Sequence, residues 1–160
     1  MLAKILTSAT VGVDAYPVTV EVDISRGLPS FSTVGLPDNA VKESKDRVKS
    51  AIKNSGYDFP AKRITINLAP AHIKKEGTAF DLPVAIGILK AGGVIKNDSL
   101  DDYFILGELS LDGAIKPVRG ALSVAVCAHA EGKNLILPEG NREEAALVDG
   151  VAVYGVKNLP

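Results

Sequence analysis

The segment from Asp38 to Gly56 constrains the fold of this chain most, because it predicts a helix that must bury one of its faces. Apolar or small residues recur in it at intervals of three and four: Ala40, Val41, Ser44, Val48, Ala51 and Ile52. Asp38 is suited to cap the first turn of a helix over residues 39–55, and Asn54-Ser55-Gly56 predicts a left-handed C-cap. The rest of the chain has to supply a surface for this stripe.

Strand signals on both sides of the helix supply that surface. Residues 16–24 alternate valine or isoleucine with polar residues, the period of a half-buried strand. Residues 103–109 and 114–117 are predicted to pair as a hairpin around Asp112-Gly113. The other predicted strands are 3–11, 30–34, 63–68, 134–137 and 151–156, and the other predicted helices are 82–91, 119–130 and 142–148. We expect a single α/β domain, of α+β type with a mixed sheet, over residues 1–160.

Composition narrows the class of protein. The chain is 46% hydrophobic and carries 18 Lys and Arg against 19 Asp and Glu, so any nucleic-acid surface must be a local patch. The single cysteine, Cys127, excludes an internal disulfide and suits a reducing compartment. No window reaches the ~20 apolar residues of a membrane span. We therefore expect a soluble cytoplasmic protein with no membrane partner. The scarcity of aromatic residues disfavours platforms on which single-stranded bases stack.

A tight loop over residues 74–82, KKEGTAFDL, joins the strand at 63–68 to the next helix. This loop, together with residues 107–120 and 135–141, resembles the domain of Lon-type proteases. The stretch 34–89 resembles still more closely the N-terminal domain of the ComM/YifB family, the magnesium-chelatase-like AAA+ ATPases. The resemblance covers nearly the whole chain, and it implies a Lon protease-like fold, also called the ribosomal protein S5 domain 2-like fold.

Matching the loops to Lon-type proteases places the catalytic dyad on residues without the required chemistry. The serine position falls on Ala79 and the lysine position on Leu122, so the resemblance implies a chain that is not an enzyme. Thr78 is one residue away, and Lys74, Lys75 and Lys116 are available amines, but a shift of one residue redirects the side chain. The loop is then expected to be structural, with Gly77 in a tight turn and Asp81 as a cap or first-turn acid.

Basic residues are the remaining candidates for binding. Those proposed for sequence-independent contacts to DNA phosphates are Lys42, Lys45, Lys49, Lys53, Lys62, Arg63, Lys74 and Lys75. A solvated helix face, diluted by Glu43 and Asp46, is the alternative. His72 and His129 have no cysteine or carboxylate residue at metal-ligand spacing, and Cys127 is predicted to be a small core residue. No metal or cofactor is therefore expected in this chain.

The resemblance implies a function that resides in a longer protein. Members of the family look like bacterial, hexameric, ATP-driven DNA motors of competence and recombination. An ATPase module is therefore expected after residue 160, with ATP and Mg²⁺ bound there, since residues 1–160 contain no P-loop sequence. This chain would contribute to ring assembly and DNA guidance, although the fragment alone is expected to be monomeric or weakly associating. The alternative is a protein-interaction scaffold that holds a peptide by strand addition or in the former substrate cleft, favoured if Phe31, Phe59 or Phe80 is exposed. A residual serine peptidase is less favoured.

Overall fold

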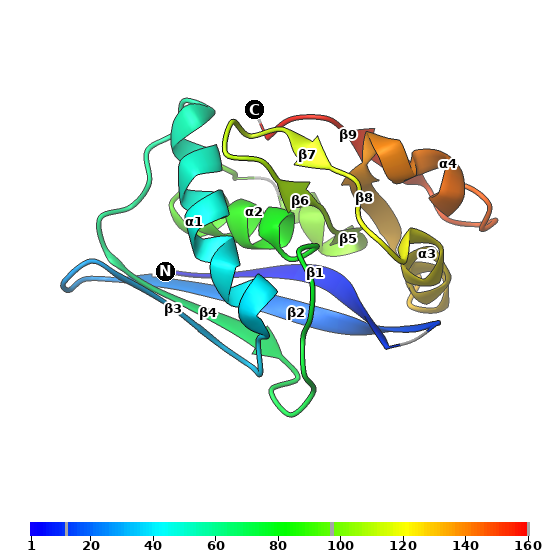
Figure 1. Ribbon diagram of the computed structural model, residues 1–160, viewed down its shortest axis with the longest axis horizontal. Coiled ribbons are helices and arrows are strands. Elements are labelled where there is room, and N and C mark those ends of the chain that lie inside the picture. Colours follow the sequence, from blue (N-terminus) through cyan, green and yellow to red (C-terminus); the bar gives the residue numbers. More distant parts are fainter. Residues whose placement is uncertain (12, 97, 160) are drawn as a thin grey trace.

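The computed structural model describes residues 1–11, 13–96 and 98–159, and a four-stranded sheet forms the base of the molecule (Figure 1). The strand order is β1-β2-β4-β3. The bounds are Leu2–Val11 for β1, Asp14–Ser25 for β2, Arg63–Ala69 for β4 and Ser30–Val34 for β3. β2 is antiparallel to both of its neighbours, β1 and β4, whereas β3 runs parallel to β4 and forms one edge of the sheet.

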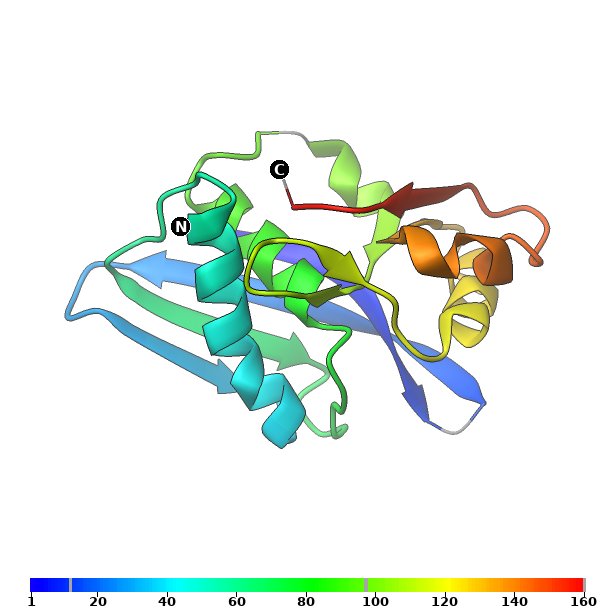
Figure 2. The same ribbon diagram turned by 45° about the horizontal axis from the view of Figure 1, so that its top comes forward.

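Two helices, α1 (Asn39–Asn54) and α2 (Asp81–Ala91), lie on the same side of this sheet. α2 packs on β1 and β2, and α1 packs beside α2 (Figure 2). The opposite side of the sheet is exposed and polar, as the alternation of buried and exposed residues along β2 requires. None of the helices in the described residues is long and apolar enough to cross a bilayer.

The C-terminal half adds two smaller sheets. β5 (Tyr103–Ile105), β8 (Asn134–Pro138) and β9 (Val153–Val156) form a parallel sheet, and β6 (Glu108–Leu109) pairs with β7 (Ile115–Lys116). The remaining elements are α3 (Ala121–Ala130), α4 (Arg142–Ala145) and the 3-10 turns η1 (Asp98–Asp102) and η2 (Glu139–Asn141). The mixed α/β architecture agrees with the predicted fold class.

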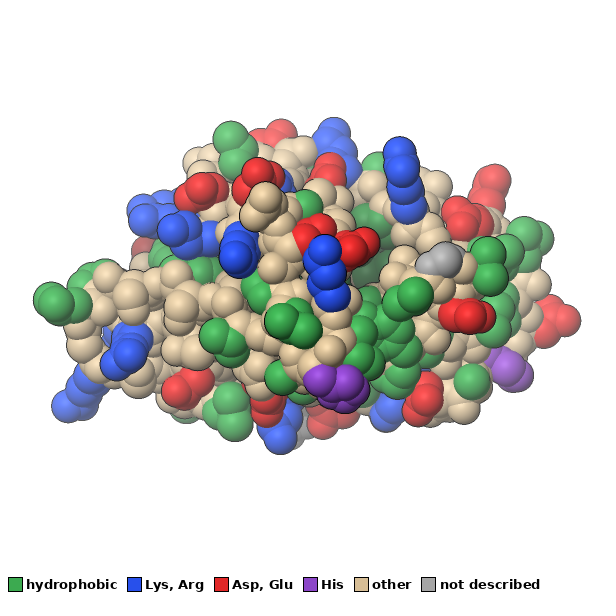
Figure 3. Space-filling view, turned by 60° about the horizontal axis from the view of Figure 1, so that its bottom comes forward, with side chains coloured by type: hydrophobic (Ala, Val, Ile, Leu, Met, Phe, Trp, Pro, Cys, Tyr) green, Lys and Arg blue, Asp and Glu red, His purple; other side chains and the backbone are tan. Residues whose placement is uncertain are grey.

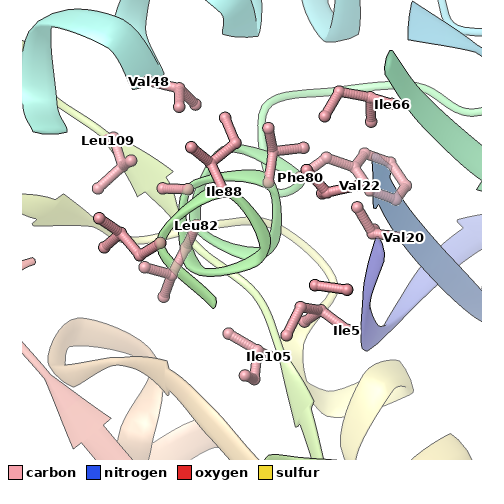
Figure 4. Packing of buried hydrophobic residues seen from close by; sticks show 14 of the residues in the cluster. Ile5, Val20, Val22, Val48, Ile66, Phe80, Leu82, Ile88, Ile105 and Leu109 are labelled. Atoms are coloured by element: carbon pink, nitrogen blue, oxygen red, sulfur yellow. The ribbon is translucent and has the colours of Figure 1, made fainter. Parts of the chain in front are cut away.

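The hydrophobic core surrounds α2 (Figure 4). Ile5, Val20 and Val22 of the sheet lie on one side of this helix, and Val48 of α1 and Leu109 of β6 lie on the other. All five side chains are at most 2% exposed. Burial of one such side chain contributes about 1.5–3 kcal/mol to the free energy of folding. The alternation in β2 and the apolar stripe on α1 both direct their apolar residues into this core.

Both predicted ends of α1 are confirmed. The Asp38 carboxylate accepts a hydrogen bond from the Val41 amide at 2.8 Å, which is an N-cap. At the other end Gly56 has a φ of +90°, and the Tyr57 amide donates to the Ile52 carbonyl. The left-handed C-cap that Asn54-Ser55-Gly56 predicts is therefore present, in a Schellman arrangement.

The predicted hairpin over 103–117 is only partly correct. Its second half forms as the β6–β7 pair, but Tyr103–Ile105 pairs in parallel with β8 instead. The strand breaks at Gly107, whose amide donates to the Ala79 carbonyl and whose carbonyl accepts from the Leu82 amide. A Cβ on residue 107 would lie 3.1–3.3 Å from side-chain atoms of Ile115 and Leu82, so a larger residue would require these side chains to shift.

An ion pair between the partly buried Arg47 and the fully buried Asp81 connects α1 to α2. Arg47 Nε donates to Asp81 Oδ2 at 2.7 Å and Arg47 Nη2 donates to Oδ1 at 3.0 Å. The Leu109 amide of β6 also donates to Oδ2, at 3.0 Å. Asp81 is the first residue of α2, but its carboxylate makes no cap; Phe80 is the N-cap residue. Of the two predicted roles, Asp81 has that of a first-turn acid of α2 and not that of its cap, because the carboxylate is turned toward Arg47. The hydrogen bond to Asp81 raises the pKa of Arg47.

We predict that Asp81→Ala lowers the free energy of unfolding by about 3–5 kcal/mol, since it leaves the Arg47 guanidinium without its partner. Urea denaturation measures this change. Glu43→Ala is the matched control, because Glu43 is an exposed partner of the same arginine at 3.8 Å and is expected to contribute less than about 1 kcal/mol. Equal effects of the two substitutions would contradict a central role for the buried pair.

Candidate functional site

Four lysines form a row along α1, and we refer to Lys42, Lys45, Lys49 and Lys53 as the α1 lysine row. All four are exposed, while the stripe that includes Val41 and Val48 is buried. A helix rises 1.5 Å per residue, so the row extends over about 16 Å. Within the described residues, no carboxylate forms an ion pair with these amines. Figure 3 shows Lys and Arg side chains gathered in the upper left of the view, on the side where α1 lies.

A groove runs between the C-terminal half of α1 and the start of β3, and we call it the lysine groove. Its volume is about 390 Å³. Its charged lining consists of Lys45, Lys49, Lys53 and Lys62 with Asp46, and Phe31 and Phe59 contribute an apolar wall. The two phenylalanine rings stack with centroids 6.4 Å apart, and Lys49 Nζ lies 5.8 Å from the centroid of Phe59. Four positive charges against one negative charge make this groove suitable for an anionic ligand.

The other predicted contacts fall in different places. Lys62 joins the groove, but Arg63 alternates with the buried Ile64 along β4 and so lies on the solvent face of the sheet, opposite α1. Lys74 is exposed near the N-terminus of α1, where its amine pairs with Glu76 at 3.5 Å. The structure thus brings Lys62 to the row, leaves Lys74 near one end of it and separates Arg63 from it.

Lys75 was predicted as a phosphate contact, and this prediction is wrong. Its side chain is fully buried, and its amine donates a hydrogen bond to the Pro70 carbonyl. Its backbone bonds to Leu36 and Asp38, which holds the loop against the start of α1. Burial lowers the pKa of the Lys75 amine, because the charged form loses its hydration.

The loop with the serine-like position lines a second groove, of about 560 Å³. Gly77 has a φ of +89° and donates its amide to Asp38 Oδ2 at 3.2 Å, which confirms the predicted tight turn. Ala79 faces this groove together with Thr78, and the Ala79 carbonyl accepts from the Gly107 amide at 3.0 Å. These loop contacts use backbone groups and the Asp38 side chain, and none uses the side chain of residue 79.

Leu122, at the lysine-like position, occupies the first turn of α3. Its side chain is 41% exposed and does not line the groove beside Ala79, while its amide donates to Glu144 Oε2 at 3.0 Å. In the part of the chain that the structure describes, no hydrogen bond joins the Thr78 hydroxyl to a lysine amine. The same part contains no group of three or more His, Cys, Asp or Glu side chains placed to hold a metal ion.

Comparison with known proteins identifies the family. A model of the family described as "Subunit ChlI of Mg-chelatase" matches residues 20–141, well over half of the chain. This chain belongs to that Mg-chelatase-like family. It is 50% identical to the uncharacterized protein YifB of Escherichia coli over 149 residues, and 43% identical to the competence protein ComM of Haemophilus influenzae over 158 residues.

The two alignments cover nearly all of this chain but less than a third of each relative. They include 93% of this chain and 29% of YifB, and 99% of this chain and 31% of ComM. The chain therefore spans about three tenths of the length of these relatives. A Lon protease of Syntrophus aciditrophicus is 27% identical over 135 residues, 78% of this chain and 17% of the protease. This similarity supports the Lon-like description of the fold.

Sequence reasoning missed two features of the site. The ion pair of Arg47 with Asp81 was not predicted, although an arginine on the side of α1 opposite the lysine row is a signal of such a pair. The stacking of Phe31 on Phe59 had no local signal, because β3 and the segment after α1 meet only in the folded chain.

We predict that Lys75→Met weakens the pH dependence of the free energy of unfolding in the alkaline range. Because burial lowers the folded-state pKa of Lys75, the unfolded chain binds a proton that the folded chain does not, between that lowered pKa and the ordinary value of 10.5. The stability of the unsubstituted protein should therefore rise relative to that of Lys75→Met as pH approaches about 10. Urea denaturation of both proteins across pH measures the difference. A difference that does not change with pH would contradict burial of a titrating amine.

Proposed function

We propose that this chain is a non-catalytic domain of a longer, cytoplasmic AAA+ ATPase of the Mg-chelatase-like family, and that it contacts the phosphates of DNA. In this proposal the ATPase module binds ATP and Mg²⁺, and the full-length protein assembles as a homo-hexamer. The similarity to a protein named for competence supports the association with DNA.

The α1 lysine row is the observation that carries this proposal. The amines of its four lysines are exposed and free of ion pairs within the described residues, and Lys62 extends the positive surface across the groove. A flexible ammonium group contacts phosphate as a point charge without reading base edges, so binding would be independent of sequence and sensitive to salt. Because the net charge of the chain is near zero, each subunit would bind weakly. Several rows in one ring would then add by multivalency.

The lack of catalysis follows in this proposal from the residues at the two dyad positions. The methyl group of Ala79 cannot attack a carbonyl, and Leu122 supplies no amine and lies away from the groove. The nearest alternative nucleophile, Thr78, faces the groove, but the Lys75 amine is buried and bonded to Pro70. The contact of Lys75 with Pro70 supports the proposal, because it keeps this amine from serving as the base for Thr78.

We predict that changing Lys42, Lys45, Lys49 and Lys53 together to Glu abolishes DNA binding by this domain. Fluorescence anisotropy with single-stranded, duplex and four-way-junction DNA across a salt series measures the effect. In the unsubstituted protein, log K should fall as log salt rises, and each lysine that contacts a phosphate should add about 0.7–0.9 to the magnitude of that slope. Single Lys→Glu substitutions should lower the slope by about that amount.

The matched control changes Lys4, Lys96, Lys116 and Lys157 to Glu. These residues are exposed and outside the row, so the change in net charge is the same while the row stays intact. DNA binding that falls equally in the control and in the row variant would show a general charge effect and count against the row. A domain that binds none of the three DNA forms at low salt would refute the proposal.

We also predict no peptidase activity for the unsubstituted protein or for Ala79→Ser, since a serine hydroxyl without a base is a weak nucleophile. Hydrolysis of labelled casein measures this, with Thr78→Ala as the control that distinguishes a relocated nucleophile from a contaminant. Cleavage that requires Thr78 would show that the domain is an enzyme.

A further inference from the structure

The edge of the main sheet at β3 borders the lysine groove. β3 is the last strand in the order β1-β2-β4-β3, and in the described residues only β4 pairs with it. Ser30 and Phe31 of this strand line the groove, across which α1 presents Lys45, Lys49 and Lys53. An open strand edge that faces a helix across a groove is the geometry in which an extended peptide can add as another strand.

The register of β3 identifies the backbone groups that face the open edge. The Ser30 amide donates to the Lys62 carbonyl at 3.4 Å, so Ser30 directs its N–H toward β4. Successive N–H groups of a strand point to opposite sides, and the N–H groups of Phe31 and Thr33 therefore point away from β4. The described residues supply no partner for these two amides. They are available to a strand added from outside.

The charges beside this edge determine what can add to it. Four lysines and one aspartate line the groove, so a segment rich in glutamate or aspartate is complementary to it. The same lysines oppose pairing with β3 of a second copy, which would bring like charges together. The Phe31–Phe59 pair is only partly buried and offers apolar contact to alternate side chains of an extended segment.

We propose that the lysine groove binds an acidic, extended peptide segment, which pairs with the outer edge of β3 through Phe31 and Thr33. This interaction does not require DNA binding. Because both ligands would use Lys45, Lys49 and Lys53, such a segment would compete with DNA for the α1 lysine row. The proposal thus adds a regulatory partner to the proposed function.

Thr33→Pro tests the strand addition without removing a charge. It deletes the outward N–H and puts a proline ring at the open edge, where proline is tolerated because the ladder to β4 does not use that N–H. Thr33→Ala is the matched control. The probe is a short fluorescein-labelled peptide that alternates glutamate with valine, and two further peptides either replace glutamate with lysine or carry N-methyl groups on alternate amides. Anisotropy measures the affinity, and hydrogen exchange measures protection of the Phe31 and Thr33 amides.

We expect the glutamate–valine peptide to bind the unsubstituted protein and Thr33→Ala equally, and Thr33→Pro about tenfold more weakly. The lysine peptide and the N-methylated peptide should not bind, and the Phe31 and Thr33 amides should gain protection. Equal binding to Thr33→Pro and Thr33→Ala, or binding without added protection of these amides, would overturn the proposal in favour of simple charge attraction.

The DNA assay on the same proteins separates this proposal from the previous one. Thr33→Pro should bind DNA as the unsubstituted protein does, which also shows that it is folded. DNA binding without any peptide binding would overturn strand addition and leave the DNA role intact. Peptide binding without DNA binding would overturn the DNA role and leave strand addition intact.

Discussion

The ion pair between Arg47 and Asp81 determines how α1 is presented. Two donors of the partly buried guanidinium bond to the fully buried carboxylate, which also accepts a hydrogen bond from the Leu109 amide. On a helix Arg47 lies about opposite Lys45 and Lys49. Together with the buried stripe of α1, the contact of Arg47 with α2 therefore favours the orientation in which the α1 lysine row faces outward. The surface proposed to bind anions thus depends on a contact in which none of its lysines takes part.

The loop at residues 76–80 is held in shape by contacts that do not depend on the side chain of residue 79. The turn at Gly77 is held by Asp38, and the Ala79 carbonyl is held by the Gly107 amide. Neither contact involves the side chain of residue 79, so a serine-to-alanine difference there changes the chemistry of the groove without disturbing the contacts that shape it. Lys75 also has a structural role, because its buried amine donates a hydrogen bond to the carbonyl of Pro70, directly after β4.

The lysine groove combines attraction of anionic groups by its lysines with an open strand edge at β3. Charge alone would accept phosphates or carboxylates, since ammonium groups attract either. The open edge of β3 discriminates between them, because only a polypeptide can continue a ladder of backbone hydrogen bonds. A surface of this kind could bind DNA and still be regulated by a protein segment.

Sequence patterns alone were enough to predict the family resemblance, the mixed α/β class, both caps of α1, the alternation in β2 and the turn at Gly77. The caps of α1 and the alternation in β2 depend on residues close together in the chain, where spacing and capping chemistry act directly. The tertiary structure decided the rest: the division of 103–109 between two sheets, the burial of Lys75, the position of Arg63 on the opposite face and the partner of Arg47. The physical reason is that burial and pairing are set by groups brought together from distant parts of the chain, such as Gly107 with Ala79, and local spacing carries no record of those neighbours.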